Sequence, residues 1–228
     1  MDSGRLSRIV AALAQEGPSD PTAYPGRVCS VAVGLLGMTG AGLSLRGERE
    51  PGALWTTDEV AEGIEQAQLT LGEGPRVDAF SSGAPVLEPD LTAAVSRWPF
   101  FCPAALGLGV RALFAFPLQV GASRLGVLDL CRNDPGFVSD DELADGLILA
   151  DVASQDLLDL QAQSGIPWAE SDVRGQQARV HQATGMIAAQ LDSSMADALA
   201  RLRGQAFSTG STIHDVADEV LGRRLRFT

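Results

Sequence analysis

The polar side chains best suited to chemistry lie near the C-terminal end of the chain. Arginine pairs with phosphate, and arginine, histidine and glutamine can stack on or hydrogen-bond an unpaired base. Residues 172–228 hold seven arginines against six acidic residues, whereas residues 1–171 hold ten against 23. The C-terminal segment is therefore the part that can approach nucleic-acid phosphates, and its net charge of +1 makes binding depend on where each arginine lies. The candidates are Arg179, His181, Gln182, Arg201, Arg203 and His214.

The sequence lacks the groupings that an enzyme active site needs. Its two histidines, His181 and His214, both lie in the C-terminal segment, so the sequence does not indicate acid–base catalysis. Three widely separated cysteines match neither a disulfide framework nor a zinc site, and we expect them to be buried. The acidic run 140–142 opens a predicted helix, where carboxylates complement the helix dipole. We predict no catalytic residues, no metal site and no cofactor.

Three short amphipathic helices are predicted to carry the candidate residues. In the first, Val173–Leu191, apolar residues recur at spacings of three and four and polar residues occupy the other face. A second helix follows Ser194, three residues before Asp197, and a third follows Thr212, three residues before Asp215. Both pairs match the arrangement in which a hydroxyl caps the first helical turn. The segment is predicted to form a three-helix bundle with an apolar core.

A glycine, Gly185, stands inside the first of these helices. Glycine in a helix interior costs about 1 kcal/mol relative to alanine. We therefore expect another group to pass close to this position. A neighbouring helix is the favoured interpretation, and an RNA backbone is the alternative.

The bundle resembles the ANTAR domain. The resemblance is carried by Ala183-Thr184-Gly185-Met186-Ile187, by Ala198, Leu202 and Ala206, and by Ile213-His214-Asp215-Val216-Ala217. It implies a domain that dimerises, binds paired hairpin loops in nascent transcripts and prevents transcription termination. Thr184 stands where many members have a basic residue, and Gly210 where many have asparagine. The residues expected to contact RNA are Arg179, His181, Gln182, Thr184, Arg201, Arg203, Gly210 and His214.

Upstream of the bundle, the predicted elements alternate between helix and strand. Residues 24–36 are predicted to be helical, with a buried strand as the alternative, and a turn is predicted at 71–75 because no nucleotide-binding motif surrounds its glycines. The order favours a sheet flanked by helices. The predicted helices are 5–14, 24–36, 57–69, 93–106 and 139–163, and the predicted strands are 41–45, 53–56, 85–88, 110–120 and 124–130.

This upstream region, roughly residues 20–160, resembles the GAF domains that are fused to ANTAR domains in actinobacteria. The resemblance is carried by Gly40–Leu45, Leu71–Pro75, Pro85–Leu87 and Gly126–Leu130. It implies a six-stranded sheet with a pocket on one face, which in some members holds a small molecule. No cyclic-nucleotide or bilin signature is present. The candidates to line such a pocket are Trp55, Phe80, Trp98, Phe114 and Phe116, and an ordinary core is the alternative interpretation.

The predicted fold is α+β, with a GAF-like antiparallel sheet flanked by helices and then a small ANTAR bundle. We place the sensory domain at residues 1–163, a linker and hinge at 164–170, and the RNA-binding domain at 171–228. No apolar run approaches the roughly eighteen residues of a membrane helix, and no signal peptide is visible, so a cytoplasmic protein is expected. The long predicted helix 139–163 has more apolar surface than one domain face requires, which favours a homodimer.

The predicted function is RNA-binding transcription antitermination, with RNA hairpins as the partner and a small molecule or protein as the ligand of the sensory domain. Two alternatives stand beside it. One is a protein-interaction or signalling module with a degenerate ANTAR segment. The other is a DNA-binding regulator, which would need outward arginine, asparagine or glutamine on its recognition helix. The third helix instead offers chiefly His214, Asp215, Asp218 and Glu219.

Overall fold

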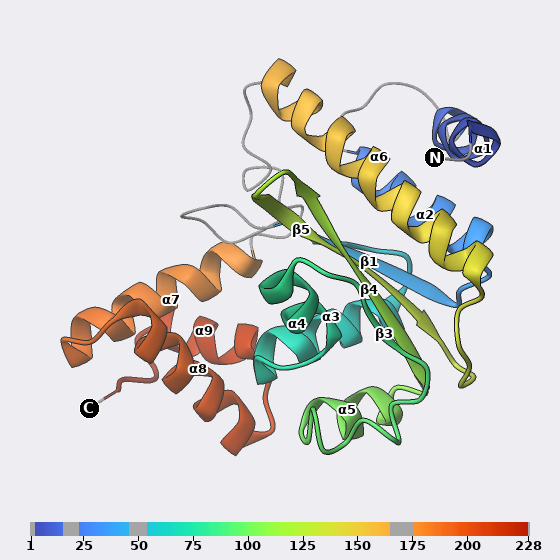
Figure 1. Ribbon diagram of the computed structural model, residues 1–228. Helices are drawn as coiled ribbons and strands as arrows, with labels where there is room; N and C mark the ends of the chain where they lie inside the picture. The colour runs from blue at the N-terminus through green and yellow to red at the C-terminus, as the bar shows by residue number, and fades with distance from the viewer. Residues whose placement is uncertain (1–2, 16–22, 46–53, 165–175, 228) are drawn as a thin grey trace.

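A computed structural model describes residues 3–15, 23–45, 54–164 and 176–227 (Figure 1). Its larger part has three layers, in which a central sheet separates two groups of helices, and a three-helix bundle lies beside one of these groups. The predicted linker, 164–170, lies outside the described residues except for Ser164. The hinge expected there therefore stays a prediction.

The central sheet is antiparallel throughout, with strand order β2-β1-β5-β4-β3. Its strands are β1 (Gly40–Leu45), β2 (Leu54–Thr56), β3 (Val86–Glu88), β4 (Ala112–Val120) and β5 (Ser123–Arg132). The hairpin of β4 and β5 turns at Gly121, whose φ of 59° suits glycine. All five predicted strands are confirmed, and the described part of the sheet has one strand fewer than the resemblance implies.

One face of the sheet is covered by α2 (Tyr24–Leu36) and α6 (Asp140–Ser164), with α1 (Ser3–Gln15) packed against both. The helical interpretation of 24–36 is confirmed, and the strand alternative is wrong. Phe114 and Phe116 project from β4 into this core. α6 lies close to β4 at Gly146. A Cβ at this position would lie 2.6 Å from the Phe116 ring, so only glycine fits without a shift.

The other face is covered by α3 (Glu59–Leu71), α4 (Pro75–Ser82) and α5 (Phe101–Gly107). α4 did not emerge from the sequence pattern, although Pro75 suits the first turn of a helix. The predicted helix 93–106 is wrong over its first half, where turns precede α5. Proline disfavours a helical conformation of the residue before it, so Pro99 delays the helix, while Pro103 is tolerated within the first turn of α5.

The C-terminal bundle consists of α7 (Gln176–Leu191), α8 (Met195–Thr209) and α9 (Ile213–Leu221). Both predicted caps are confirmed: Ser194 Oγ accepts a hydrogen bond from Asp197 N, and Thr212 Oγ1 accepts one from Asp215 N, each at 3.1 Å. The Asp215 carboxylate also accepts a hydrogen bond from the backbone N of Thr212, which completes a capping box. The bundle core is apolar, as its spacing predicts.

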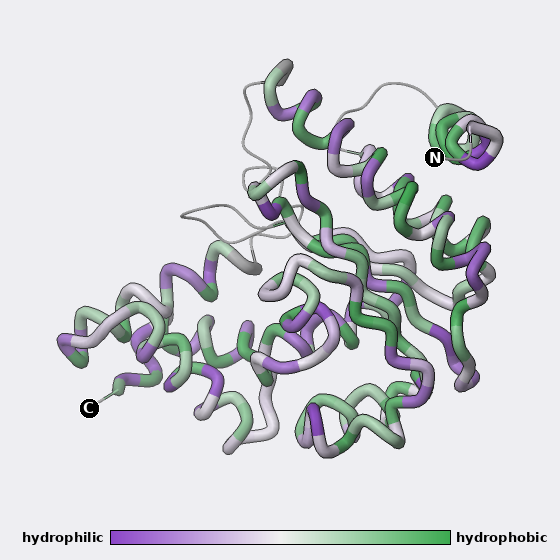
Figure 2. The backbone as a smooth tube through the Cα atoms, viewed as in Figure 1, coloured by the Kyte–Doolittle hydropathy of each residue, from purple (hydrophilic) through white to green (hydrophobic). Residues whose placement is uncertain are grey.

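Hydropathy follows this architecture (Figure 2). The strands are mostly hydrophobic, whereas hydrophobic and hydrophilic residues alternate along α6 and α7. The three cysteines, Cys29, Cys102 and Cys131, are free and buried, as expected. Among the described residues, no helix is long and apolar enough to cross a membrane.

Candidate functional site

The exposed polar residues of the bundle follow α7 and α8. Arg179, His181, Gln182 and Arg201 are all exposed. Because an α-helix turns about 100° per residue, Arg179 and His181 lie about 200° apart around α7, with Gln182 on the outward arc between them. These side chains therefore cover the whole outer surface of α7 and do not form a single cluster.

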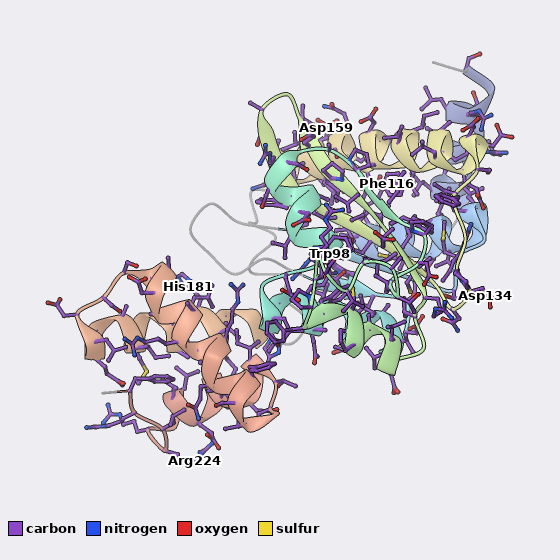
Figure 3. All side chains as sticks on the ribbon, turned by 60° about the horizontal axis from the view of Figure 1, so that its bottom comes forward. Trp98, Phe116, Asp134, Asp159, His181 and Arg224 are labelled. Carbon is purple, nitrogen blue, oxygen red and sulfur yellow. The ribbon has the colours of Figure 1, made fainter. Side chains whose placement is uncertain are left out.

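Arg179 lies on the flank of α7 that faces α9. Its guanidinium forms an ion pair with the Asp218 carboxylate, and Arg224 Nη2 lies 3.5 Å from the Asp218 carbonyl oxygen. Figure 3 places Arg224 on the opposite side of the bundle from His181. The basic groups around Asp218 thus belong to a second surface, separate from His181.

The C-terminal arginines extend this second surface. After α9 the chain returns to α7, where Phe227 N donates a hydrogen bond to Gln190 Oε1 at 3.0 Å. Arg223, Arg224 and Arg226 are exposed along this return. They are absent from the predicted RNA-contact set, although three arginines within four residues are a visible signal in the sequence.

Three of the predicted contact positions, in addition to Arg203, are not freely exposed side chains. Thr184 is 3% exposed, and its hydroxyl donates to the Val180 carbonyl at 2.7 Å, so it faces the bundle core. His214 is partly buried on α9. Gly210 is exposed but has no side chain, and its φ of 62° ends α8 in the left-handed conformation.

The space beside Gly185 is open. A Cβ built at this position would meet no atom within 4 Å outside its own helix backbone. The expected close approach of a neighbouring helix is therefore wrong for the described residues. The alternative, an RNA backbone, stays a prediction.

Arg203 points away from solvent and toward the sheet-containing part of the molecule. Its Nε donates to the carbonyl oxygen of Leu69, near the end of α3, at 3.0 Å. Beside it, a Cβ at Gly72 would lie 2.8 Å from Arg203 Nη1. The structure thus places one predicted RNA-binding arginine in a contact between the bundle and α3.

Two further contacts join the same regions. Ile213 N lies 3.4 Å from Thr70 Oγ1, and the rings of Phe100 and Phe207 pack edge to face with centroids 5.0 Å apart. Phe100 and Phe207 remain 52% and 57% exposed, so this aromatic contact lies at the rim. Neither aromatic was among the predicted site residues.

The aromatic residues predicted to line one pocket lie on both sides of the sheet. Phe114 and Phe116 pack into the core under α2 and α6, with Trp55 at its edge. Trp98 and Phe80 pack into the core under α3, α4 and α5. A single pocket lined by all five is therefore wrong, because side chains two apart on β4 share one face and that face is opposite to Trp98.

A buried polar cluster lies on the α3 side of the sheet. Gln68 Nε2 donates to Asp129 Oδ2 on β5 at 2.8 Å, and Gln68 Oε1 accepts from Arg76 N at 2.8 Å. Arg76 also forms an ion pair with Glu65 at 3.1 Å. Glu65 and Asp129 are 2% and 3% exposed. β1 admits the glutamate at Gly42, where a Cβ would lie 2.8 Å from Glu65 Oε1.

The Glu65 carboxyl affects the ionisation of Asp129. Burial, and then the neighbouring Glu65 carboxyl, raise the pKa of Asp129 well above its ordinary value. Among the described residues, Asp129 Oδ1 and Glu65 Oε1 accept no hydrogen bond from another group. A proton shared between these carboxyl groups satisfies both, as in other buried acid pairs. The raised pKa of Asp129 therefore favours its protonated, uncharged form.

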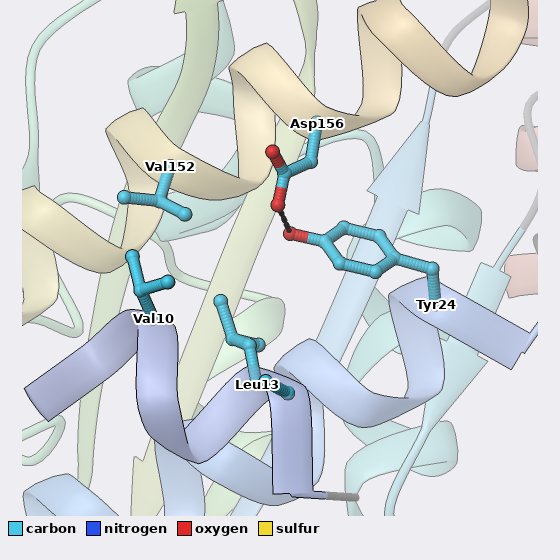
Figure 4. Close-up of a pocket in the computed structure, with 6 residues that line it drawn as sticks. Val10, Leu13, Tyr24, Val152 and Asp156 are labelled. Carbon is cyan, nitrogen blue, oxygen red and sulfur yellow. Dashed lines mark hydrogen bonds between the residues drawn. The ribbon is translucent and has the colours of Figure 1, made fainter. Parts of the chain in front are cut away.

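A separate pocket of about 250 Å³ opens between α1, α2 and α6 (Figure 4). The Tyr24 hydroxyl donates to Asp156 Oδ2 at 2.6 Å at its edge. Burial, and then this bond, raise the pKa of Tyr24, so the phenol stays protonated. The pocket is otherwise apolar and was not predicted from the sequence. Its lining residues are Val10, Leu13, Ala14, Tyr24, Val152 and Asp156.

Comparison with known families decides which family these two regions represent. A GAF domain model matches residues 26–157, more than half of the chain, and an ANTAR domain model matches residues 175–221. The chain belongs to the GAF–ANTAR proteins. GAF and ANTAR domains are regulatory, so the chain joins a sensing domain to an output domain. No curated protein matches the chain.

Solved structures show the same fold for the GAF domain. A GAF domain of an Acinetobacter phosphoenolpyruvate-protein phosphotransferase matches at 16% identity and TM-score 0.55, covering 72% of this chain and 96% of its own. The corresponding Coxiella burnetii domain matches at 15% and 0.54, covering 73% and 100%. Free methionine-R-sulfoxide reductase from Neisseria meningitidis matches at 15% and 0.50, covering 70% and 89%. At these identities the likeness shows the fold alone.

These matches assign the described sites to domains. The buried polar cluster lies within the GAF match, whereas the pocket beside α1 is lined partly by residues that precede that match. The exposed arginines belong to the ANTAR domain and the residues that follow it. Arg203 is the ANTAR residue that contacts the GAF domain at Leu69. The predicted domain limits at 163 and 171 remain a prediction.

Proposed function

We propose that the chain is an antitermination regulator whose ANTAR domain binds RNA hairpins under the control of its GAF domain. The observation that carries this is the ANTAR match over 175–221, in a bundle that keeps Arg179, Gln182 and Arg201 outside a complete apolar core. Arginine and glutamine there can reach phosphates and the edges of unpaired loop bases. The exposed Arg223, Arg224 and Arg226 add positive charge on the second surface of the bundle.

We further propose that the RNA-binding form is a homodimer. A segment with a net charge of +1 neutralises few phosphates, and pairing two ANTAR domains doubles the number of contacts. Leu147 on α6 is exposed, which supports this helix as part of the dimer surface. Sedimentation at tens of micromolar should show a dimer, and a monomer at that concentration would contradict this part of the proposal.

The test of RNA binding is a fluorescence-anisotropy titration with a labelled RNA that carries two hairpins. The controls are an RNA with one hairpin and an RNA whose stems are disrupted by sequence changes. We expect the two-hairpin RNA to bind most tightly and its affinity to fall as salt rises, because bound phosphates release counterions. Equal, weak binding of all three RNAs would refute hairpin recognition.

A second candidate is a protein-interaction module with a degenerate ANTAR domain. It is favoured by the partners that Arg179 and Arg203 already have in Asp218 and the Leu69 carbonyl. A folded protein that binds no hairpin RNA even at low salt would support it. A DNA-reading function has less support, because α9 exposes Asp215 and Glu219.

A further inference from the structure

The ANTAR bundle rests on the C-terminal end of α3. The last carbonyl groups of a helix have no partner within it, and the carbonyl of Leu69 receives its bond from Arg203 at 3.0 Å. The guanidinium also lies at the negative end of the helix dipole. Gly72 allows this approach because it has no side chain, and its φ of 71° ends the helix there. Arg203 is therefore held by its hydrogen bond to the Leu69 carbonyl, by the helix dipole and by its close fit against Gly72.

Apolar contacts also join the bundle to the GAF domain. The Leu69 side chain packs against the ANTAR core, and Phe100 packs edge to face on Phe207. Both residues of this pair project from the ends of their helical regions, Phe100 just before α5 and Phe207 near the end of α8. The contact thus fixes α8 against the GAF domain at more than one point.

The turn of α3 that holds Arg203 also belongs to the buried polar cluster. Gln68, adjacent to Leu69, bonds both Asp129 and the backbone of Arg76. Its own carbonyl accepts the bond from Gly72 N at 3.0 Å. Gln68 thus links the buried cluster to the turn of α3 whose next carbonyl, that of Leu69, accepts the bond from Arg203.

We infer that the contact between α8 and the end of α3 inhibits RNA binding by holding Arg203 against the GAF domain, and that α8 must leave α3 for tight binding of hairpins. This inference rests on the proposed RNA-binding function. The Glu65–Gln68–Asp129 cluster is the route by which a change within the GAF domain reaches the contact. The docked form is the restrained form of the regulator.

The first test opens the contact without changing any predicted RNA residue. The variant Leu69→Ala/Phe100→Ala removes apolar contacts on the GAF side only. If about 90% of molecules are docked, opening them should lower the apparent Kd for two-hairpin RNA about tenfold. The matched control is Val60→Ala/Phe137→Ala, which truncates exposed residues in the first turn of α3 and in the loop before α6. The control should bind as the parent does.

The second test closes the contact. In Phe100→Cys/Phe207→Cys, a short disulfide-containing bismaleimide should join the two introduced thiols, because the three native cysteines are buried. The cross-linked protein should bind RNA at least tenfold more weakly than the same variant without cross-linker. Cleaving the linker with a reductant should restore binding.

The outcomes separate the inference from the proposed function. Unchanged RNA affinity after cross-linking, or an opened variant that binds no more tightly than its control, overturns the inhibitory contact while leaving RNA binding intact. If parent and opened variant are both folded by circular dichroism and neither binds hairpin RNA, the proposed function fails and the inference fails with it.

Discussion

The ANTAR bundle and the α3 side of the GAF domain place their polar groups in opposite ways. The bundle buries ten apolar residues in its core and keeps its arginines outside or at its edge. The α3 side of the GAF domain buries Glu65, Gln68 and Asp129 against the sheet. An apolar core is held by close packing, whereas the hydrogen bonds of a buried polar cluster depend on which of its groups carry a proton. We therefore expect the bundle to carry contacts rigidly and the α3 side to respond to a signal.

Removing the bundle core should give the largest effect. Val180→Ala and Ile187→Ala each delete buried methyl groups, and we expect each to lower the free energy of unfolding by about 1 to 5 kcal/mol. RNA binding should be lost only as the ANTAR domain unfolds. Circular dichroism and anisotropy, recorded on the same samples, check this. RNA binding lost from a bundle that melts like the parent would show that these residues act directly.

Removing the outer arginines should weaken RNA binding while leaving the stability of the fold almost unchanged. Arg179→Ala/Arg201→Ala opens no cavity, so the fold should change by only about 0.5 kcal/mol per site. If each arginine contacts one phosphate, the slope of log Kd against log salt should fall by about 1.4 per protomer, at roughly 0.7 per contact for unpaired RNA. A matched control is Arg97→Ala, an exposed arginine of the GAF domain. An unchanged salt slope in the double variant would place the RNA elsewhere on the bundle.

Replacing the buried acid should change how GAF stability depends on pH. The folded pKa of Asp129 is raised, so the folded protein keeps a proton that the unfolded chain releases above about pH 4. The stability of the wild type should therefore fall as pH rises above that value toward the folded pKa. Asp129→Asn, which cannot ionise, should lose this dependence, so its melting temperature should exceed that of the wild type by more at pH 8 than at pH 5.

The control for this variant is an exposed carboxylate. Hydrogen bonds from Thr92, and then Arg111, lower the pKa of Asp90, so any stability it contributes is present at neutral pH and lost in acid. Asp90→Asn should therefore differ from the wild type by a constant amount between pH 5 and pH 8, and that difference should change only below about pH 4. If the melting temperatures of Asp129→Asn and the wild type differ by the same amount at every pH from 5 to 8, the shared-proton interpretation is wrong.

The smallest expected effect is at Gly185. A Cβ there meets open space, so Gly185→Ala should stabilise α7 by about 1 kcal/mol. Gly204→Ala on α8 is the matched control, because its Cβ also meets nothing within 4 Å. If an RNA backbone approaches α7 here, only Gly185→Ala should weaken RNA binding. Equal affinity of the two variants would remove RNA as the reason for this glycine.

Local signals in the sequence predicted much of this fold. The Ser194 and Thr212 caps, the five strands and most helix limits depend on neighbouring residues, and the structure confirms them. The sequence could also have predicted that Phe114 and Phe116 lie on the same face of the sheet, because alternate residues of a strand share a face. Grouping the aromatics by residue type overlooked this period of two.

Other features depend on parts of the chain that meet only in the folded protein. The partner of Arg203 is a backbone carbonyl 134 residues away, and no side-chain pattern identifies it. The acid pair of Glu65 and Asp129 joins a helix to a strand that is distant in sequence, so neither carboxylate looked unusual alone. Thr184 entered the predicted contact set through the ANTAR resemblance, because many members have a basic residue there, whereas the apolar arc of α7 is wide enough to bury it.

Because α3 is long, a small tilt about its N-terminal end moves the Leu69 carbonyl at the Arg203 contact by a large distance. The helix has 13 residues, so it extends about 20 Å at 1.5 Å per residue, from the Asp58 cap beside β2 to the bundle. If it pivots at that cap, a tilt of about 5° moves the Leu69 carbonyl by about 1.5 Å at the same rise per residue. That displacement stretches a 3.0 Å hydrogen bond beyond bonding distance unless α8 follows. A tilt of this size is therefore enough to break the hydrogen bond between Arg203 and Leu69, which is one of the contacts that hold α8 against α3.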